Sequence, residues 1–231
     1  MNGQGFAGFP HDCVAFLEEL KQHNDRAWFE RNRERYQNSV LQPARAFVAA
    51  LGLRLYEIAP AIQADATASI FRIQRDLRFS KDKSPYKTNL SLWLWEGSRP
   101  RLECSGFYCE LEPPELLLAA GIYRFPRPLL AQYRASVVHA LQGPELIRVV
   151  ARVRSRRRYQ FGGQHFKQTP RGYSSEHPNA KWLLHDGLFA AHRAAVPPEL
   201  FGPELVEYCF ARFRDMLPLH TWLRGMVQRA G

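Results

Sequence analysis

The chain has 231 residues, of which 45% are hydrophobic and 13% aromatic, so it can bury a substantial core and is neither a disordered nor a low-complexity protein. Its formal net charge of +10 favours polyanions as partners, although an arginine-rich composition by itself is a weak indication. No apolar run reaches the roughly 18 residues that a membrane span needs, and the N-terminus lacks the basic and apolar regions of a signal peptide. We therefore expect a cytoplasmic protein with no membrane partner.

A chain of this length forms one large domain or two small ones, and we expect a single domain over residues 1–231. Its cysteines lack the paired spacing of a metal site. Cys104 and Cys109 lie an odd number of residues apart on an expected strand, so they face opposite sides and cannot form a disulfide there. We interpret all the cysteines as reduced thiols: Cys13, Cys104, Cys109 and Cys209.

Helical periodicity dominates the N-terminal part of the chain. Apolar spacing predicts a helix over residues 11–22 with Asp12 as its N-cap, and then a second helix capped by Asn24 and Asp25. A longer apolar stripe predicts a helix over residues 40–59, which Pro60 ends. The stripe consists of Val40, Ala44, Phe47, Val48, Leu51, Leu55 and Ile58.

The most informative stretch is residues 71–87, FRIQRDLRFSKDKSPYK. Residues 71–79 alternate between apolar and polar side chains, which predicts a half-buried strand with a charged face. Arg75 is the exception, because it shares the apolar side and therefore needs a carboxylate or carbonyl partner there. The apolar side carries Phe71, Ile73, Leu77 and Phe79, and the polar side carries Arg72, Gln74, Asp76 and Arg78.

A turn-forming run over residues 80–85 follows this strand, and alternation resumes over residues 88–95, which together predict a hairpin with a charged loop. Further strand patterns cover residues 101–112 and 115–123, so we expect an antiparallel meander. The predicted fold class is α+β, with an antiparallel sheet of about four or more strands in the middle of the chain, packed by N-terminal and C-terminal helices.

Two helical patterns follow Pro126, and arginines gather at the end of the second. They either grip phosphate groups or, in the simpler interpretation that we favour, complement the helix dipole as solvated cations. These residues are Arg152, Arg154, Arg156, Arg157 and Arg158.

Residues 159–189 contain many helix and strand breakers and predict a long irregular segment that packs over another part of the protein. Its polar residues that we expect to face a site are Lys167, Arg171, Tyr173 and His177. Two more helices, over residues 203–217 and 218–227, are expected to close the core.

Familiar catalytic motifs are absent or lack their structural context. Residues 3–8 match G-x-G-x-x-G, but no strand precedes them. Neither a GxxxxGK[ST] loop nor a GxSxG elbow occurs. The spacing of His177, His185, Asp186 and His192 is not that of a metal site, and we expect none. The sequence identifies no cofactor.

Several blocks of residues together form a specific pattern. The signature is Arg72-x-x-Arg75-Asp76-x-Arg78-Phe79, followed by SKDKSPYK over residues 80–87. An earlier block consists of residues 24–29 with Tyr36 and Pro43, and a middle block consists of Gly121, Pro126 and Arg134. The later block is Lys167-x-x-Pro170-Arg171-Gly172-Tyr173 with His177 and Pro178. This pattern resembles a widespread bacterial and fungal family classified as a domain of unknown function. The resemblance covers nearly the whole chain and implies a shared full-length fold. The chain departs from the pattern at Leu184-His185-Asp186, where a basic residue is usual.

Three functional hypotheses follow. The leading one is that the hairpin and the later polar block form one basic pocket for a phosphate-bearing or other anionic ligand, such as a small nucleotide or, with weaker support, nucleic acid. The first alternative is a metal-assisted phosphoryl-transfer or hydrolytic enzyme in which Asp76 or Asp82 holds a cation. The second is a non-catalytic interaction protein with a structural Arg/Asp network. The predicted ligand-binding residues are Arg72, Arg75, Asp76, Arg78, Lys83, Tyr86, Lys87, Lys167, Arg171 and Tyr173.

Overall fold

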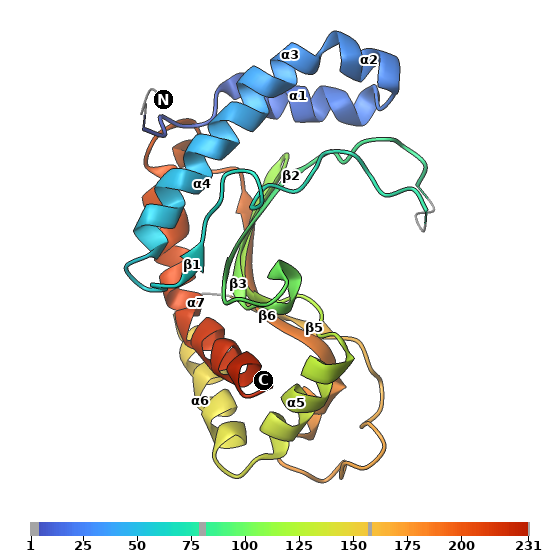
Figure 1. Ribbon diagram of the computed structural model, residues 1–231, viewed down its shortest axis with the longest axis vertical. Helices are drawn as coiled ribbons and strands as arrows, with labels where there is room; N and C mark the ends of the chain where they lie inside the picture. The colour runs from blue at the N-terminus through green and yellow to red at the C-terminus, as the bar shows by residue number, and fades with distance from the viewer. Residues whose placement is uncertain (1–4, 79–81, 157–158, 231) are drawn as a thin grey trace. The chain divides into compact units, whose positions relative to one another are not determined.

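The structure, a computed structural model, describes residues 5–78, 82–156 and 159–230. In these residues a six-stranded antiparallel sheet is preceded and followed along the chain by helices (Figure 1). This confirms the predicted α+β class. The strands lie in the order β1 (Ile62–Gln63), β2 (Leu90–Glu96), β3 (Gly106–Glu112), β4 (Glu115–Ile122), β6 (His185–Ala195) and β5 (Gln160–Gln164).

Contacts divide the chain into two compact units. The first comprises Met1–Leu94, Tyr108–Leu118 and Arg193–Ala211, and the second comprises Trp95–Phe107, Ala119–His192 and Arg212–Gly231. Strands β2, β3, β4 and β6 contribute residues to both units. The single domain expected from the sequence stays a prediction.

The first unit begins with the helices α1 (His11–Gln22), α2 (Arg26–Arg31), α3 (Arg33–Tyr36) and α4 (Gln42–Leu55), with a π-helical turn η1 (Gln37–Leu41) between the last two. Helix α1 has the predicted bounds. Asp25 caps α2 as predicted, because its carboxylate accepts a hydrogen bond from the Trp28 N–H at 2.9 Å. The predicted Asp12 cap is wrong: Pro10 is the N-cap residue of α1, and Asp12 instead accepts hydrogen bonds from Arg35.

Helix α4 carries the predicted apolar stripe, although it is shorter than residues 40–59. Phe47, Val48 and Leu51 are fully buried, and burying such a side chain supplies about 1.5–3 kcal/mol. On the same buried part of the helix, one turn after Val48, Gly52 lies so close to Ala64 that an added Cβ would sit 2.3 Å from the Ala64 Cβ. Glycine at this position therefore allows the chain around Ala64 to lie directly against α4.

The predicted meander is present with shorter bounds. Residues 88–95 contain most of β2, and residues 115–123 contain β4. Residues 101–112 do not form one strand, because a 3-10 helix, η2 (Arg101–Glu103), precedes β3. Pro113 and Pro114 separate β3 from β4, as their inability to donate to a sheet ladder predicts.

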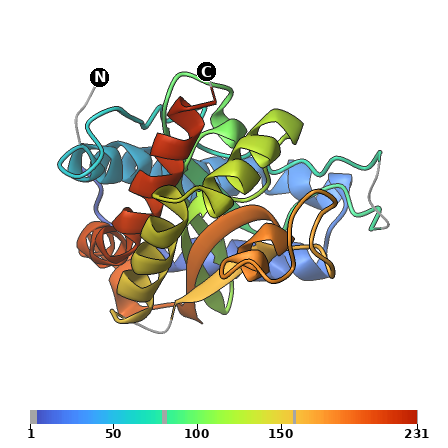
Figure 2. The ribbon, with the colours of Figure 1, turned by 90° about the horizontal axis from the view of Figure 1, so that it is seen from below.

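The second unit contains α5 (Arg127–Val138), α6 (Gln142–Arg154) and the 3-10 helix η3 (Ala180–Leu184). The prediction of an irregular segment over residues 159–189 is correct for residues 165–179 but wrong on both sides of them, because β5 and the first part of β6 lie there as an antiparallel pair (Figure 2). The glycines and alanines of these strands give no apolar alternation, so pairing within the sheet makes them strands. Glycine is required at position 187 of β6, because the Tyr123 carbonyl oxygen lies so near that a Cβ there would be 1.9 Å from it.

The chain ends with the 3-10 helix η4 (Pro198–Phe201) and the helix α7 (Leu205–Gln228). A single helix replaces the two that were predicted over residues 203–217 and 218–227, with Pro218 in its interior. A proline there removes one helical hydrogen bond and costs about 3 kcal/mol. The neighbouring Met216 and Leu219 are fully buried, and this packing keeps the helix continuous.

Two further expectations concern disulfides and membranes. All the cysteines are free and buried, as predicted. Among the described residues, no helix combines the length and the apolar character that crossing a bilayer demands.

Candidate functional site

The central stretch of the sequence forms two extended segments, residues 70–78 and 82–89, which together we call the arm. Both segments run outward from β2 beside helices α1 to α3 (Figures 1 and 2). They pair antiparallel at Gln74 and Tyr86, and the Lys87 N–H donates to the Ile73 carbonyl at 2.8 Å. The hairpin pairing is therefore present.

A regular strand over residues 71–79 is not present, and that prediction is wrong. Only isolated bridges occur, at Ile70 and Gln74. Pro85 of the facing segment has no N–H to donate, which interrupts the ladder. Phe79 and the predicted turn residues 80 and 81 lie outside the described residues.

The predicted alternation along the arm is confirmed. Arg72, Gln74, Asp76 and Arg78 are exposed, whereas Ile73 is buried. Arg75 lies among the less exposed side chains, as its place in the period requires.

Arg75 has the partners that its partly buried position requires. Its Nη1 lies 3.1 Å from the Asp82 Oδ2, and its Nη2 donates to the Tyr86 carbonyl at 3.2 Å. Its buried Nε has no hydrogen-bond partner in the described part of the chain. Arg75 thus ties the two segments of the arm together.

The other charged groups near the tip of the arm are also paired internally. Arg78 donates from Nε and Nη2 to the two carboxylate oxygens of Asp76 at 3.0 and 2.7 Å. These hydrogen bonds hold the pKa of Asp76 far below its ordinary value. Lys83 Nζ donates to the Leu77 carbonyl at 3.0 Å. Such exposed pairs shape the arm but contribute little to stability.

At the base of the arm, Tyr86 belongs to the core. Its ring is buried and stacks on Phe29 with 4.1 Å between ring centroids. Its backbone N–H donates to Asn24 Oδ1, and its carbonyl accepts from Asn24 Nδ2, both at 3.0 Å. Lys87 Nζ lies 5.4 Å from the centroid of the Phe71 ring. The base of the arm is therefore anchored by packing.

A hollow of about 290 Å³ lies between the arm and the helical region around η1 and α4. Arg45 and Arg72 line it, together with Gln37, Thr67 and Gln74. None of the described residues that line it is acidic. In the described part of the chain neither arginine has a carboxylate oxygen within 4.0 Å.

Tyr36 is a further wall of this hollow. Burial raises the pKa of its hydroxyl to about 12, and the positive charge of Arg45 acts in the opposite direction. The hydroxyl therefore stays protonated at neutral pH. The hollow is thus lined by cations and neutral groups, a composition that suits an anion.

The later polar block lies in the second unit, whereas the arm lies in the first. Lys167 and Arg171 are exposed, and Tyr173 is partly exposed. A turn orders the block, with the Tyr173 N–H donating to the Pro170 carbonyl at 3.2 Å and Gly172 at a φ of 89°. That this block and the arm form one pocket stays a prediction.

One polar cluster that sequence reasoning missed lies in the first unit, on the paired strands β2 and β3 and on the residue before β2. The Glu110 Oε2 accepts hydrogen bonds from Tyr108 at 2.5 Å, Asn89 at 3.0 Å and Ser91 at 3.3 Å. Burial and the Glu110 carboxylate raise the pKa of the Tyr108 hydroxyl, so it remains a donor. The alternation of each strand contained the signal, but the pairing of β2 with β3 was needed to bring the four side chains together.

A second missed cluster is buried in the second unit. His220 Nδ1 lies 3.0 Å from Ser105 Oγ, His220 Nε2 lies 2.8 Å from Glu96 Oε2, and Arg224 donates to Glu96 Oε1 at 2.7 Å. Ser105, His220 and Glu96 are each at most 3% exposed. A nucleophile so enclosed cannot meet a substrate, and the cluster is a structural network. Glu96 and His220 are 124 positions apart, so no local pattern could reveal the contact.

In residues 5–78, 82–156 and 159–230, no group of three or more His, Cys, Asp or Glu side chains is arranged to hold a metal ion.

Fold and site together define an α+β protein with an antiparallel sheet and a polar arm beside a basic hollow. The chain belongs to the family described as Conserved hypothetical protein (DUF2461), whose model matches residues 12–222. This confirms the family resemblance noted in the sequence. Neither the curated proteins nor the solved structures gave a significant match.

Proposed function

We propose that the protein binds a small phosphate-bearing or other anionic ligand in the hollow beside the arm. The observation that carries this proposal is the pair Arg45 and Arg72, two guanidinium groups without a carboxylate partner among the described residues, at a hollow without an acidic lining residue. An arginine whose charge is not neutralised by the protein is available to a ligand.

The donor set of the hollow matches a tetrahedral oxyanion. A guanidinium group offers a planar fork that binds two phosphate oxygens at once, and such charge-assisted bonds are about twice as strong as neutral ones. Gln37, Gln74 and Thr67 add neutral donors. The volume of about 290 Å³ lies near the lower end of typical ligand pockets, so the ligand is expected to be a phosphate group with a small body.

The remaining predicted ligand residues of the arm support this site indirectly. Arg75 with Asp82, and Asp76 with Arg78, fix the extended shape of the arm. That shape keeps Arg72 and Gln74 on the exposed face, opposite the buried Ile73. The participation of Lys167, Arg171 and Tyr173 is part of the wider hypothesis and requires the arm and the later block to meet.

The test is a thermal-shift titration of the full chain with inorganic phosphate and with a small sugar phosphate. A ligand that binds only the native state at about 100 times its Kd stabilises it by about 2.7 kcal/mol. We expect both ligands to raise the melting temperature of the native protein. Arg45→Gln and Arg72→Gln should each abolish the shift.

Arg26→Gln is the matched control, because Arg26 is an exposed arginine of the same unit that does not line the hollow. It should keep the full shift. If neither ligand stabilises the native protein, or if all three variants respond alike, the site is not in this hollow.

One observation favours a second candidate, a non-catalytic interaction protein with a structural Arg/Asp network. The cations Arg75 and Arg78 are already paired with Asp82 and Asp76. Under this candidate the phosphate titration gives no shift, and Arg72→Gln changes nothing measurable. No comparable observation favours the metal-assisted enzyme, which stays a prediction.

A further inference from the structure

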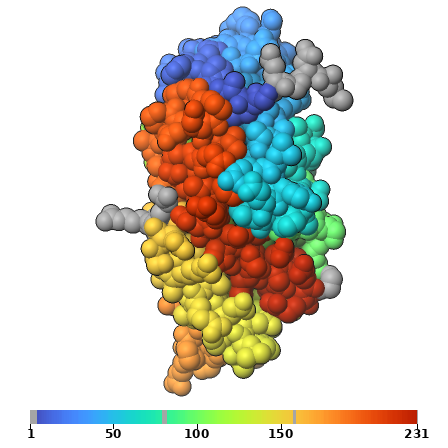
Figure 3. Space-filling view, turned by 90° about the vertical axis from the view of Figure 1, so that its left-hand side faces the viewer, coloured from blue at the N-terminus to red at the C-terminus, as the bar shows by residue number. Residues whose placement is uncertain are grey.

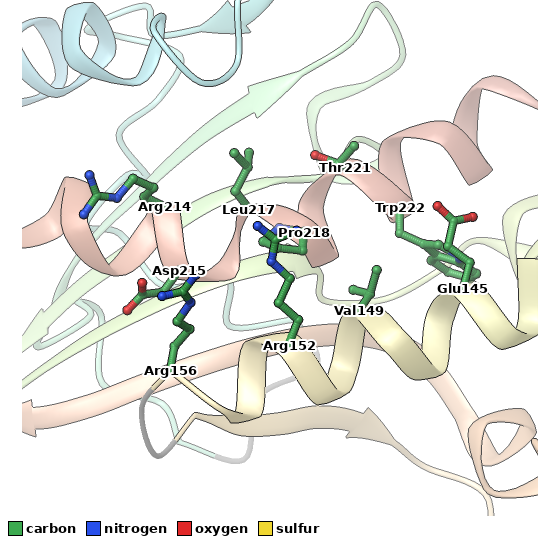
Figure 4. A pocket seen from close by; sticks show the side chains of 10 residues that line it. All are labelled: Glu145, Val149, Arg152, Arg156, Arg214, Asp215, Leu217, Pro218, Thr221 and Trp222. Carbon is green, nitrogen blue, oxygen red and sulfur yellow. The ribbon is translucent and has the colours of Figure 1, made fainter.

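A further cavity lies in the second unit, far along the chain from the arm. It has a volume of about 570 Å³ and is bordered by α6 and by the part of α7 after residue 212. Figure 3 shows these two helices side by side on the surface, α6 in yellow and the end of α7 in red. Figure 4 shows the lining side chains at close range. The cavity is a groove between two helices, and we call it the α6–α7 groove.

The face of α6 that borders the groove follows from helical spacing. Glu145, Val149 and Arg152 lie at i, i+4 and i+7, and Arg156 follows one turn later. Leu146, which lies beside this face on α6, is fully buried in the core. The helix thus buries its apolar stripe and leaves a second stripe facing the groove.

Charge is distributed unevenly along this stripe. Arg152 of α6 and Arg156, just after the end of α6, extend toward α7 at one end of the groove, and Glu145 lies at the other end beside Trp222 (Figure 4). Seven residues separate Glu145 from Arg152, which corresponds to ~10 Å along a helix. Among the described residues neither Arg152 nor Arg156 has an ion-pair partner within 4.0 Å.

The middle of the groove is apolar. Val149 of α6 faces Leu217 and Pro218 of α7. At the Glu145 end, the Trp222 ring is held in place, because its Nε1 donates to the Gln142 carbonyl at 3.2 Å and its ring packs edge-on against Tyr133. Arg214 and Asp215 of α7 also line the end where Arg152 and Arg156 lie, so that end carries three cations and one carboxylate. The groove therefore runs from a mainly cationic end, past an apolar wall, to the Glu145 carboxylate at its other end.

We propose that the α6–α7 groove is a second ligand site, separate from the hollow beside the arm, and that its ligand is a nucleoside monophosphate with an amino-bearing base. Its phosphate group binds between the guanidinium groups of Arg152 and Arg156. Its ribose and base lie along Val149, Pro218 and the edge of Trp222, and the amino group of the base donates to the Glu145 carboxylate.

A bound mononucleotide explains the position of these arginines at one end of the groove better than the helix dipole alone does. The dipole favours cations in the last turn of α6, but it accounts neither for the apolar middle of the groove nor for a carboxylate at its far end. An anion without a body, such as inorganic phosphate, would use only the cationic end. A mononucleotide reaches all three regions.

The first experiment is calorimetric titration of the full chain with adenosine monophosphate, with adenosine and with inorganic phosphate. We expect adenosine monophosphate to bind more tightly than either fragment. Arg152→Gln and Arg156→Gln should each weaken its binding by about tenfold or more, the change that follows from losing a charge-assisted hydrogen bond. Arg148→Gln, an exposed arginine of α6 outside the groove, should bind like the native protein.

The second experiment tests the contact between the base and Glu145. It uses inosine monophosphate, which carries a carbonyl group where adenosine monophosphate carries its amino group. The native protein should prefer adenosine monophosphate, because a carbonyl oxygen facing the Glu145 carboxylate has no hydrogen to donate. Glu145→Gln should narrow this preference, since a carboxamide serves both bases. Unfolding curves of each variant establish that the fold is intact.

Several outcomes would overturn the proposal. They are no binding of adenosine monophosphate to the native protein, an equal loss in Arg148→Gln, or an unchanged base preference in Glu145→Gln. Tighter, steeply salt-dependent binding of a single-stranded polynucleotide through Arg152 and Arg156 would also overturn it, in favour of a nucleic-acid surface. Arg72→Gln separates the two sites, because it should abolish the phosphate shift assigned to the hollow and leave mononucleotide binding unchanged.

Discussion

Arg75 and Asp82 form the ion pair that joins the two segments of the arm, with 3.1 Å between Nη1 and Oδ2. Because Arg75 lies on the less exposed side, an apolar side chain of similar length can replace its packing while the ion pair is lost. We expect Arg75→Met to leave the free energy of unfolding nearly unchanged and Arg75→Ala to lower it. Urea denaturation measures both. Equal losses in the two variants would show that the charge, and not the packing, holds the arm.

Gly52 and Gly225 give a matched pair of helical glycines. A Cβ at Gly52 would lie 2.3 Å from the Ala64 Cβ, whereas a Cβ at Gly225 meets only the end of the flexible Arg229 side chain at 3.4 Å. We expect Gly52→Ala to destabilise the protein by about 1–3 kcal/mol through overpacking. Gly225→Ala should stabilise it by up to about 1 kcal/mol through helix propensity. Thermal unfolding of both variants checks the signs, and two changes of the same sign would contradict the packing argument.

Glu110 accepts three side-chain hydrogen bonds on one oxygen. Removing this acceptor costs Asn89, Ser91 and Tyr108 one hydrogen bond each, so Glu110→Ala should lower the free energy of unfolding by about 1–3 kcal/mol. Glu112 is the control on the same strand, because its contact with Lys21 is long, 3.9 Å, and partly exposed. Glu112→Ala should change the free energy of unfolding little. A loss as large as that of Glu110→Ala would show that the hydrogen bonds of the cluster do not stabilise the protein specifically.

Glu96 is the centre of the buried network in the second unit. Glu96→Leu should destabilise the protein by about 3–5 kcal/mol, since breaking a buried pair on one side leaves charged groups uncompensated. Glu103, whose pair with Arg99 spans 3.7 Å and is partly exposed, provides the comparison, and Glu103→Leu should have a much smaller effect. Chemical denaturation followed by tryptophan fluorescence distinguishes the two variants.

His220 makes the stability of the protein depend on pH. Burial lowers its pKa in the folded protein below 6.5, although the Glu96 carboxylate opposes the shift. The unfolded chain therefore takes up a proton before the folded one does, and stability should fall as the pH drops below about 6.5. His185 has the same direction of shift. The slope should be smaller in His220→Gln, and an unchanged slope would assign the effect to His185.

The Asp12 and Glu19 carboxylates act in a lower pH range. Their hydrogen bonds with Arg35 lower both pKa values below 3.8 and 4.5, respectively. Their contribution is present at neutral pH and is lost only as these groups protonate in more acidic solution. Unfolding curves at a series of pH values should therefore show two separate declines.

The arm and the main helices could be predicted from the sequence because their signals are local. The period of two placed Arg72 and Gln74 on an exposed face, and the stripe through Phe47 and Leu51 placed α4 against the core. The need of Arg75 for a partner followed from its place in the same period. Local spacing determines which way a side chain points.

The hollow and the groove could not be predicted because each joins residues that are distant in the chain. Arg45 and Arg72 come from a helix and from the arm, and nothing in either segment indicates the other. Arg152 was noted in the sequence, but its facing residues on α7 were not. Strand β6 was missed for a related reason, since its neighbours in the sheet, and not its own composition, make it a strand.

The contact between Asn24 and Tyr86 has a consequence for association between copies of the protein. In the pairing of Gln74 with Tyr86, the Tyr86 N–H and carbonyl point away from the facing segment, which leaves an open strand edge. The Asn24 carboxamide accepts from this N–H and donates to this carbonyl, as the backbone of a neighbouring strand would. It therefore occupies the position where another chain could add by β-augmentation, and it protects the arm against edge-to-edge aggregation.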